Sequence, residues 1–347
     1  MRTIGAFREY EVDLGRLDNW LPWGGLIYPA VVRNKDNSLM GFIRYAQGKG
    51  GQPIKTSLAL GRGWSVWSEK RHYAGRDELT LTLCWNPFVE KKSSIIQNCL
   101  DGVKRSAGEA EQYFAYVLAT LQKEVAQTVP SRLLQDEEVL QYLAGAISGE
   151  PSSIEMYRPP LYLDAVLSRK VSFKVFGNRT DKKNELYING QGITVVSVLG
   201  WPKVSIMDTL CRAFKDLDYR LVKRVLFWDE ESAEKEIRGY MASWCRGRRT
   251  LKDFMSDQLL KPFNGIYTEM FIFRFAEDER DAREVFVESV FRQLAQPHVF
   301  EDYNRKHCWW SSIPGCFRAN VVTPLGGIDN LSELLMGGAQ DVQAESL

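Results

Sequence analysis

The segment Asn19–Ser38 (NWLPWGGLIYPAVVRNKDNS) restricts the possible folds of this chain more than any other stretch of its sequence. It contains two tryptophans and two prolines. Because proline fixes φ and removes a backbone donor, neither a long helix nor a central strand can run through it. In its second half the turn formers Asn34, Asp36 and Asn37 stand between two apolar runs. This pattern predicts a β-hairpin over residues 29–45.

Other segments show the periodicity of regular structure. Residues 63–69 and 79–85 alternate between apolar and polar positions, as half-buried antiparallel strands do. Residues 107–128 repeat apolar side chains at helical spacing, and a second helix is predicted at 136–147, with an acidic first turn that suits the helix dipole. Further elements are predicted as strands at 185–189, 193–199, 219–228, 269–275 and 299–303, and as helices at 206–215, 231–246 and 278–294.

These elements predict an α+β fold with antiparallel sheets, strand-helix-strand (ferredoxin-like) units and helices packed on the sheets. The side chains expected to face inward from the last helix are Val285, Val290, Phe291 and Leu294. The segment 149–160 is rich in helix and strand breakers, which makes it the best candidate for an internal boundary. The predicted organisation is an α+β subdomain at 1–150, a second α+β subdomain at 151–325 and a flexible tail at 326–347.

Composition excludes several classes of protein. A chain of 347 residues with 44% hydrophobic content can bury a core without disulfides, and its six cysteines form no C-x-x-C pair, so we interpret them as reduced thiols. The N-terminus lacks the apolar core of a signal peptide, and no apolar run is long enough to span a bilayer. The net charge of +1 gives no overall field that would attract nucleic acid. We expect a cytoplasmic chain, or one bound to a membrane through partners.

Motifs for catalysis are incomplete. The sequence has no G-x-x-x-x-G-K-[ST] motif, the phosphate-binding loop that P-loop ATPases require. The segment 225–230 (VLFWDE) resembles the strand that holds magnesium in such enzymes, but Asp229 and Glu230 also suit the start of a helix. His307, Cys308 and Cys316 lack the paired spacing of a zinc site. We therefore expect no catalytic, cofactor-binding or metal-binding residue. The alternative is a nucleotide hydrolase that uses Asp229 and Glu230.

One dense basic cluster follows the helix predicted at 231–246. Its residues are Arg246, Arg248, Arg249 and Lys252. Cations at this position complement the negative end of a helix, and they also suit an acidic partner surface. The alternative is a module that binds single-stranded DNA through residues 246–252, which the near-neutral charge of the whole chain disfavours.

Two segments carry a resemblance to a known family. The first holds Trp20, Leu21, Pro22 and Trp23 together with the turn residues Asn34, Lys35, Asp36 and Ser38. The second is Trp309–Arg318 (WWSSIPGCFR), with Trp310, Pro314, Gly315 and Arg318. These segments resemble the non-motor half of the conjugative-transfer and type IV secretion ATPases of the TrbE/VirB/CagE family, and the order of elements between them fits as well. Cys316 stands where that family usually has asparagine.

The resemblance implies a scaffold and docking domain of a bacterial conjugation or type IV secretion system, peripheral at the cytoplasmic face of the inner membrane. The implied partners are inner-membrane secretion subunits, and a separate motor ATPase or further copies of the chain; nucleic acid is not expected. ATP and magnesium are expected only with the RecA-like motor domain, which in the family would begin where this chain stops. The residues expected to bind partners are Trp20, Leu21, Pro22, Trp23, Arg246, Arg248 and Arg249. For the W-L-P-W segment a place in the core is an equally open alternative.

Overall fold

The computed structural model of the chain describes residues 8–11, 21–27, 30–46, 60–87, 107–149, 163–168, 173–177, 184–199, 204–227, 238, 265–303, 305–316 and 323–325. Within these ranges one sheet of 14 strands carries the helices. The first seven strands are β1 (Arg8–Glu11), β2 (Trp23–Ile27), β3 (Val31–Asn34), β4 (Leu39–Tyr45), β5 (Trp64–Tyr73), β6 (Arg76–Trp85) and β7 (Ser131–Leu133). The others are β8 (Phe173–Gly177), β9 (Asn184–Ile188), β10 (Gln191–Val198), β11 (Tyr219–Phe227), β12 (Gly265–Phe275), β13 (His298–Phe300) and β14 (Thr323–Leu325). The helices are α3 (Ala107–Ala126), α4 (Asp136–Ser148), α5 (Leu163–Ser168), α6 (Val204–Ala213), α9 (Arg280–Gln293) and α10 (Arg305–Ser311).

The sheet is antiparallel at each of its described pairings. Its main path runs β1-β8-β9-β10-β12-β11-β5-β6-β4-β3-β2, and β13, β14 and β7 pair with β10, β12 and β4. The centre is formed by β11, whose residues 219–226 pair with residues 65–72 of β5 on one side and whose other edge pairs with β12. The α+β class with a large antiparallel sheet, expected from the sequence, is therefore confirmed.

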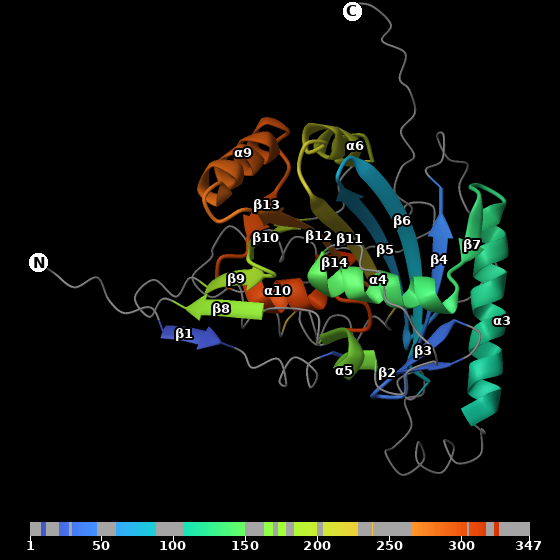
Figure 1. Cartoon of the computed structure of the whole chain (residues 1–347). Helices are drawn as coiled ribbons and strands as arrows, with labels where there is room; N and C mark the ends of the chain where they lie inside the picture. The colour runs from blue at the N-terminus through green and yellow to red at the C-terminus, as the bar shows by residue number, and fades with distance from the viewer. Residues whose placement is uncertain are drawn as a thin grey trace, which may run out of the picture.

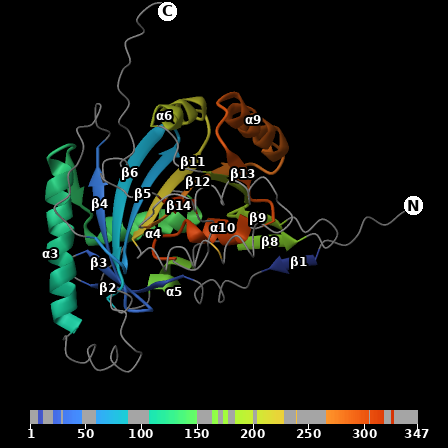
Figure 2. The same cartoon turned by 180° about the vertical axis from the view of Figure 1, so that it is seen from behind.

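Helices cover both faces of the sheet (Figures 1 and 2). Successive residues of β12 show the division, because Met270 and Ile272 belong to one apolar cluster while Phe271 and Phe273 belong to the other. The first cluster packs against α4, α5 and α10, and its side of the sheet is called the α4 face here. The second packs against α3, α6 and α9. The central strands are buried on both sides, and β5 and β11 bury charged residues such as Glu69, Arg220 and Arg224 along with apolar ones.

Several local predictions are confirmed. Strands β3 and β4 form the hairpin expected over 29–45, and β5 and β6 form a second hairpin whose turn, Ala74–Gly75, has positive φ at both residues. The helices expected at 107–128 and 136–147 are α3 and α4. The helix expected at 231–246 lies outside the described residues, except for residue 238.

One inward-facing residue of α9 was predicted wrongly. The side chain of Val285 is 68% exposed, whereas Val287 is buried together with Val290 and Phe291. Positions 287, 290, 291 and 294 share one face of a helix with 3.6 residues per turn, and position 285 lies outside that stripe. The pattern of the predicted helix was therefore correct, and its first inward position was misplaced by two residues.

The sheet continues through the boundary predicted near residue 150. Strand β5, from the first half of the chain, pairs along its length with β11 from the second half, and both apolar clusters draw residues from both halves. Whether the two halves can fold separately stays a prediction. The tail at 326–347 lies outside the described residues.

Candidate functional site

The two segments that carry the family resemblance meet in space. The indole Nε1 of Trp23, the first residue of β2, donates a hydrogen bond of 2.9 Å to the carbonyl oxygen of Pro314, 291 positions further along the chain. The residues that follow α10 thus lie against the start of β2. We call this junction the clasp, and it consists of Leu21–Trp23, Asn34–Ser38 and Ile313–Cys316.

The polar turn of the first hairpin belongs to the same junction. The amide of Lys35 donates to the carbonyl oxygen of Pro22 at 2.8 Å. Inside the turn, Asn34 Nδ2 donates to Ser38 Oγ at 2.8 Å, and Ser38 Oγ lies 2.6 Å from Asp36 Oδ1. The turn that matched the family is therefore bound to the backbone at Pro22.

Gly315 fits into the clasp because it has no side chain and its backbone is in the left-handed conformation. Its φ of +85° is a conformation that side chains with a Cβ rarely adopt. A Cβ built there would lie 2.8 Å from Met40 Sδ, 3.0 Å from Asn34 Nδ2 and 3.2 Å from Pro22 Cγ. The Pro-Gly turn thus needs glycine for backbone geometry and for space.

Arginines from the central strand hold the same segment from the side of the sheet. Arg224 Nη1 donates to the carbonyl oxygens of Cys316 at 3.0 Å and Ser311 at 3.4 Å, and Arg220 Nη2 donates to that of Ser312 at 3.1 Å. The Arg224 guanidinium also lies 5.0 Å from the centre of the Trp67 ring. Burial lowers the pKa of Arg224 to about 10. Within the described part of the chain it has no carboxylate partner, so carbonyl oxygens and an aromatic ring stabilise its charge.

The structure places the predicted partner-binding and motif residues as follows. Leu21 and Trp23 are 1% and 0% exposed, which supports the core alternative for these two side chains, and Pro22 is half-buried. Pro314 and Gly315 are buried in the clasp, and Trp310 is half-buried against the core. The predicted residues outside the described part are Trp20, Asp229, Glu230, Arg246, Arg248, Arg249, Lys252 and Arg318. Their roles stay predictions.

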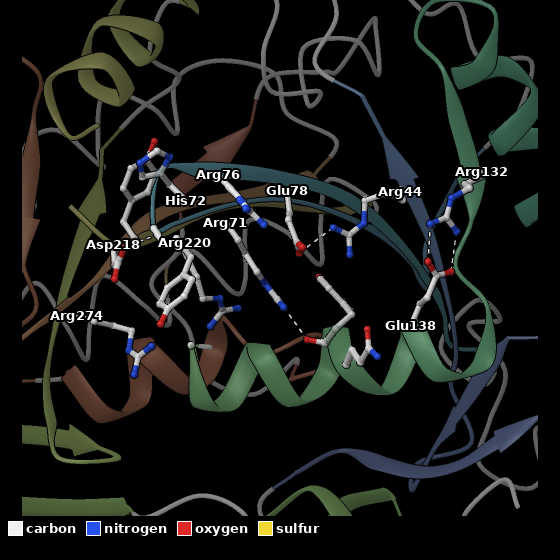
Figure 3. A pocket seen from close by; sticks show the side chains of 16 residues that line it. Arg44, Arg71, His72, Arg76, Glu78, Arg132, Glu138, Asp218, Arg220 and Arg274 are labelled. Atoms are coloured by element: carbon white, nitrogen blue, oxygen red, sulfur yellow. Dashed lines mark hydrogen bonds and ion pairs between the residues drawn. The ribbon is translucent and has the colours of Figure 1, made fainter. Parts of the chain in front are cut away.

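A second feature, which we call the arginine groove, lies on the α4 face and was not predicted from the sequence. It is a cavity of about 580 Å³ beside α4 (Figure 3). Six arginines line it, together with the carboxylates Glu78, Glu138 and Asp218. The arginines are Arg44, Arg71, Arg76, Arg132, Arg220 and Arg274, and they come from β4, β5, β6, β7, β11 and β12. Because each lies on a different strand, only the sheet topology brings them together.

Glu69 lies beneath the groove and balances two of these arginines. Its Oε1 accepts hydrogen bonds from Arg71 Nε at 2.5 Å and Arg220 Nε at 2.7 Å, and its Oε2 accepts one from the Tyr142 hydroxyl at 2.7 Å. Burial alone would raise the pKa of Glu69, but the charges of Arg220 and Arg71 outweigh burial and hold it far below its usual range. Glu69 therefore stays ionised.

The same arginines donate hydrogen bonds to carbonyl oxygens toward the C-terminal, negative end of α4. Arg71 Nη2 donates to the carbonyl oxygen of Tyr142 at 2.8 Å, and Arg220 Nη1 donates to that of Ala146 at 2.7 Å. The Arg274 side chain passes close to Gly149, the left-handed residue that ends α4. Because α4 has no basic residue in its last turn, the strands supply the cations that its dipole favours.

The other end of the groove carries paired charges. Arg44 Nη1 lies 2.8 Å from Glu78 Oε2. Both nitrogens Nη1 and Nη2 of Arg132 bind the Glu138 carboxylate, at 2.7 and 2.5 Å. The hydrogen bond from Arg132 is the main reason that the pKa of Glu138 falls to about 2. Figure 3 shows these pairs toward the N-terminal end of α4, with Arg220 and Arg274 toward its C-terminal end.

A signal for the groove was present in the sequence. Arg220, Lys223 and Arg224 are charged residues within strand 219–227. Glu69 and Arg71 stand two positions apart in β5, on the same face of the sheet. Charged residues inside strands that are buried on both sides require partners. The sequence does not say which strands are neighbours, so those partners could not be named.

The described residues contain no group of three histidine, cysteine or acidic side chains placed to hold a metal ion. Nor does this part of the chain contain a helix with the length and hydropathy needed to cross a membrane. Cys84, Cys211, Cys308 and Cys316 are free thiols, as expected.

Comparison with known proteins gives distant relatives of one kind. No protein-family model matches the chain. It is 25% identical over 265 residues to a probable conjugal transfer protein TrbE of Sinorhizobium fredii, a match that covers 67% of this chain and 38% of the relative. It is 22% identical over 314 residues to the conjugal transfer protein TrbE of Rhizobium radiobacter, covering 77% of this chain and 37% of that protein. The chain thus spans well under half the length of these curated relatives. By sequence, it is a distant relative of the TrbE conjugal transfer proteins and matches a portion of their length.

Proposed function

We propose that this chain is a scaffold and docking component of a bacterial conjugation or type IV secretion apparatus, equivalent to the non-motor part of a TrbE-type ATPase. The observation that carries this proposal is the match to two TrbE proteins over 67% and 77% of this chain but only 38% and 37% of theirs. The clasp supports it, because the residues that resemble the family form one connected structure.

The clasp suggests what the scaffold holds. It fixes the backbone at Ile313–Cys316 against the start of β2 through Trp23, Gly315 and Arg224. By resemblance, a motor domain would follow this segment. We propose that the clasp orients that connection, whether the motor is part of the same polypeptide or a separate one.

Catalysis is not part of the proposed role. The sequence lacks the G-x-x-x-x-G-K-[ST] motif, so ATP and magnesium would belong to the motor. The proposed partners are inner-membrane secretion subunits, and a motor ATPase or further copies of the chain, at the cytoplasmic face of the membrane. We assign docking to Trp20, Pro22 and the basic cluster Arg246, Arg248 and Arg249, since Leu21 and Trp23 are buried.

We also propose that the second half of the sheet contains a ferredoxin-like unit. Two strand-helix-strand segments follow each other in the chain, β10–α6–β11 and β12–α9–β13. Their strands are adjacent in the order β13-β10-β12-β11, with antiparallel pairing throughout. Helices α6 and α9 pack together on one face, as a unit of this kind requires.

The test is co-purification from donor cells of the native host. We expect the tagged chain to enrich inner-membrane subunits of the transfer apparatus, and Trp20→Ala to reduce that enrichment. Tyr116→Ala is the matched control, because Tyr116 is an exposed aromatic residue on α3. Absence of transfer subunits, or equal recovery with Trp20→Ala, would contradict the proposed docking role. ATP hydrolysis by the purified chain would favour the hydrolase alternative instead.

A further inference from the structure

Among the described residues, arginines outnumber carboxylates in the arginine groove. Six arginines line the cavity with three carboxylates, and buried Glu69 makes a fourth carboxylate beneath them. None of the described residues that line the cavity is a lysine. Guanidinium groups present fixed forks of N–H donors that match the oxygens of carboxylates and phosphates, so their exclusive use favours recognition of such groups.

One arginine of the groove is exposed at its rim. Arg76, at the start of β6, is exposed, and within the described part of the chain its side chain has no ion pair or hydrogen bond. In contrast, Arg44 and Arg132 are each paired with a carboxylate. Arg76 is therefore accessible to a ligand at the rim. Arg274 lies further along, beside the end of α4.

The paired arginines would hold a ligand site in a fixed shape. Arg71 and Arg220 are held by Glu69 and by carbonyl oxygens of α4. Their side chains would therefore lose little conformational entropy when a ligand binds. A volume of about 580 Å³ lies in the range of small-molecule sites. A long polyanion is disfavoured, because the chain as a whole carries a net charge of only +1.

From this geometry we propose that the arginine groove binds a small phosphate-bearing ligand, with Arg76 and Arg274 as its principal contacts. A phosphate group offers several acceptor oxygens around one centre, and guanidinium forks match such a group. Glu78 and Glu138 stay with Arg44 and Arg132, so the ligand would not have to displace them. Arg76 and Arg274 lie outside the clasp, and the site does not depend on the proposed docking role.

The experiment is calorimetric titration of the full chain with inorganic pyrophosphate at constant ionic strength. We expect saturable binding at one site, weakened about tenfold or more by Arg76→Gln, since a hydrogen bond to a charged group commonly contributes that much. Arg274→Gln should weaken binding as well. Arg76→Lys keeps the charge but loses the fork, so its affinity should lie between those of the wild type and Arg76→Gln.

Arg292→Gln is the matched control. Arg292 is an exposed arginine on α9, which covers the other face of the sheet, so its replacement should leave pyrophosphate binding unchanged. Melting curves of every variant identify any that fails to fold, and because Arg76 is exposed, its variants should melt like the wild type. Absence of saturable heat with the folded wild type would overturn the proposal. Equal affinity of wild type, Arg76→Gln and Arg274→Gln would overturn it too.

Two further probes test whether the ligand is instead a nucleic acid or an acidic peptide. A single-stranded oligonucleotide that bound more tightly than pyrophosphate would overturn the assignment to a small ligand, because the groove would then serve a polymer. Binding of a glutamate-rich peptide without binding of pyrophosphate would overturn the assignment to phosphate. Weak or absent binding of both, beside saturable binding of pyrophosphate, is the expected result.

Discussion

The clasp and the arginine groove occupy two regions of the same sheet face, and each contains one arginine of strand β11. Arg224 and Arg220 stand four residues apart and point to the same side. Arg224 is enclosed by the Trp67 ring and the carbonyl oxygens of Ser311 and Cys316. Arg220 shares Glu69 with Arg71 at the base of an open cavity.

This difference suggests that the clasp has a structural role and that the arginine groove binds a ligand. In the clasp the buried Arg224 donates to the backbone that follows α10. In the groove the buried pairs support further arginines that line an open cavity. Substitutions in the clasp should therefore change stability, and substitutions at the rim of the groove should change ligand binding. Four predictions test or sharpen this comparison.

The largest expected effect is that of Glu69→Gln. It leaves Arg71 and Arg220 buried without a carboxylate, and removing one partner of a buried ion pair typically costs about 3–5 kcal/mol of unfolding free energy. Urea unfolding measures the loss. Glu288→Gln on exposed α9 is the control, and it should change stability by less than about 1 kcal/mol. Similar losses for the two variants would show that the base of the groove is not held by Glu69.

Gly315→Ala should have the next largest effect. A left-handed φ costs a residue with a Cβ about 1–2 kcal/mol, and crowding against Met40 and Asn34 adds about 1–3 kcal/mol. The control is Gly75→Ala, where φ is also positive but no atom lies within 4 Å of the new Cβ. If both variants lost equal stability, close packing in the clasp would contribute nothing.

Arg224→Met should cost about 1–3 kcal/mol, because the carbonyl oxygens of Ser311 and Cys316 lose their donor inside the protein. The effect should be smaller than that of Glu69→Gln, since Arg224→Met leaves carbonyl oxygens, and no buried charge, without a partner. Unfolding in urea again supplies the measurement. A loss larger than that of Glu69→Gln would mean that the clasp, and not the buried ion pairs, dominates the stability of this face.

The smallest effect concerns the Arg132–Glu138 pair at the far end of the groove. The pKa of Glu138 is about 2 in the folded chain against an ordinary value of 4.5, so its stabilising contribution is complete above about pH 4.5 and is lost as the pH falls toward 2. Because the pair is partly exposed, we expect only about 0.5 kcal/mol. Unfolding of wild type and Glu138→Gln should differ at pH 6 and coincide near pH 2. A difference independent of pH would exclude the ion pair as its cause.

The fold was predictable to the extent that it depends on local pattern. Alternation gave β5 and β6, helical spacing gave α3 and α4, and the polar turn at 34–38 gave the first hairpin. The inward face of α9 was harder, because Val285 and Phe286 place apolar side chains on its exposed side. Such residues weaken the periodic signal on which the prediction rests.

The clasp and the arginine groove also differ in how far they could be predicted from the sequence. The residues of the clasp could be listed from the sequence because they resemble a family, but their contact could not, since Trp23 and Pro314 are 291 positions apart. The groove left only charged residues inside buried strands as a signal. Its arginines come together because β11 pairs with β5, a long-range choice that no local pattern encodes.

The most direct test of this comparison measures stability and pyrophosphate binding in the same two variants. Arg224→Met should unfold at a lower urea concentration than the wild type and should bind pyrophosphate with unchanged affinity. Arg76→Gln should unfold like the wild type and lose at least about tenfold in affinity. The reverse pattern, or two variants that change both quantities in proportion, would contradict the division between a structural clasp and a ligand-binding groove.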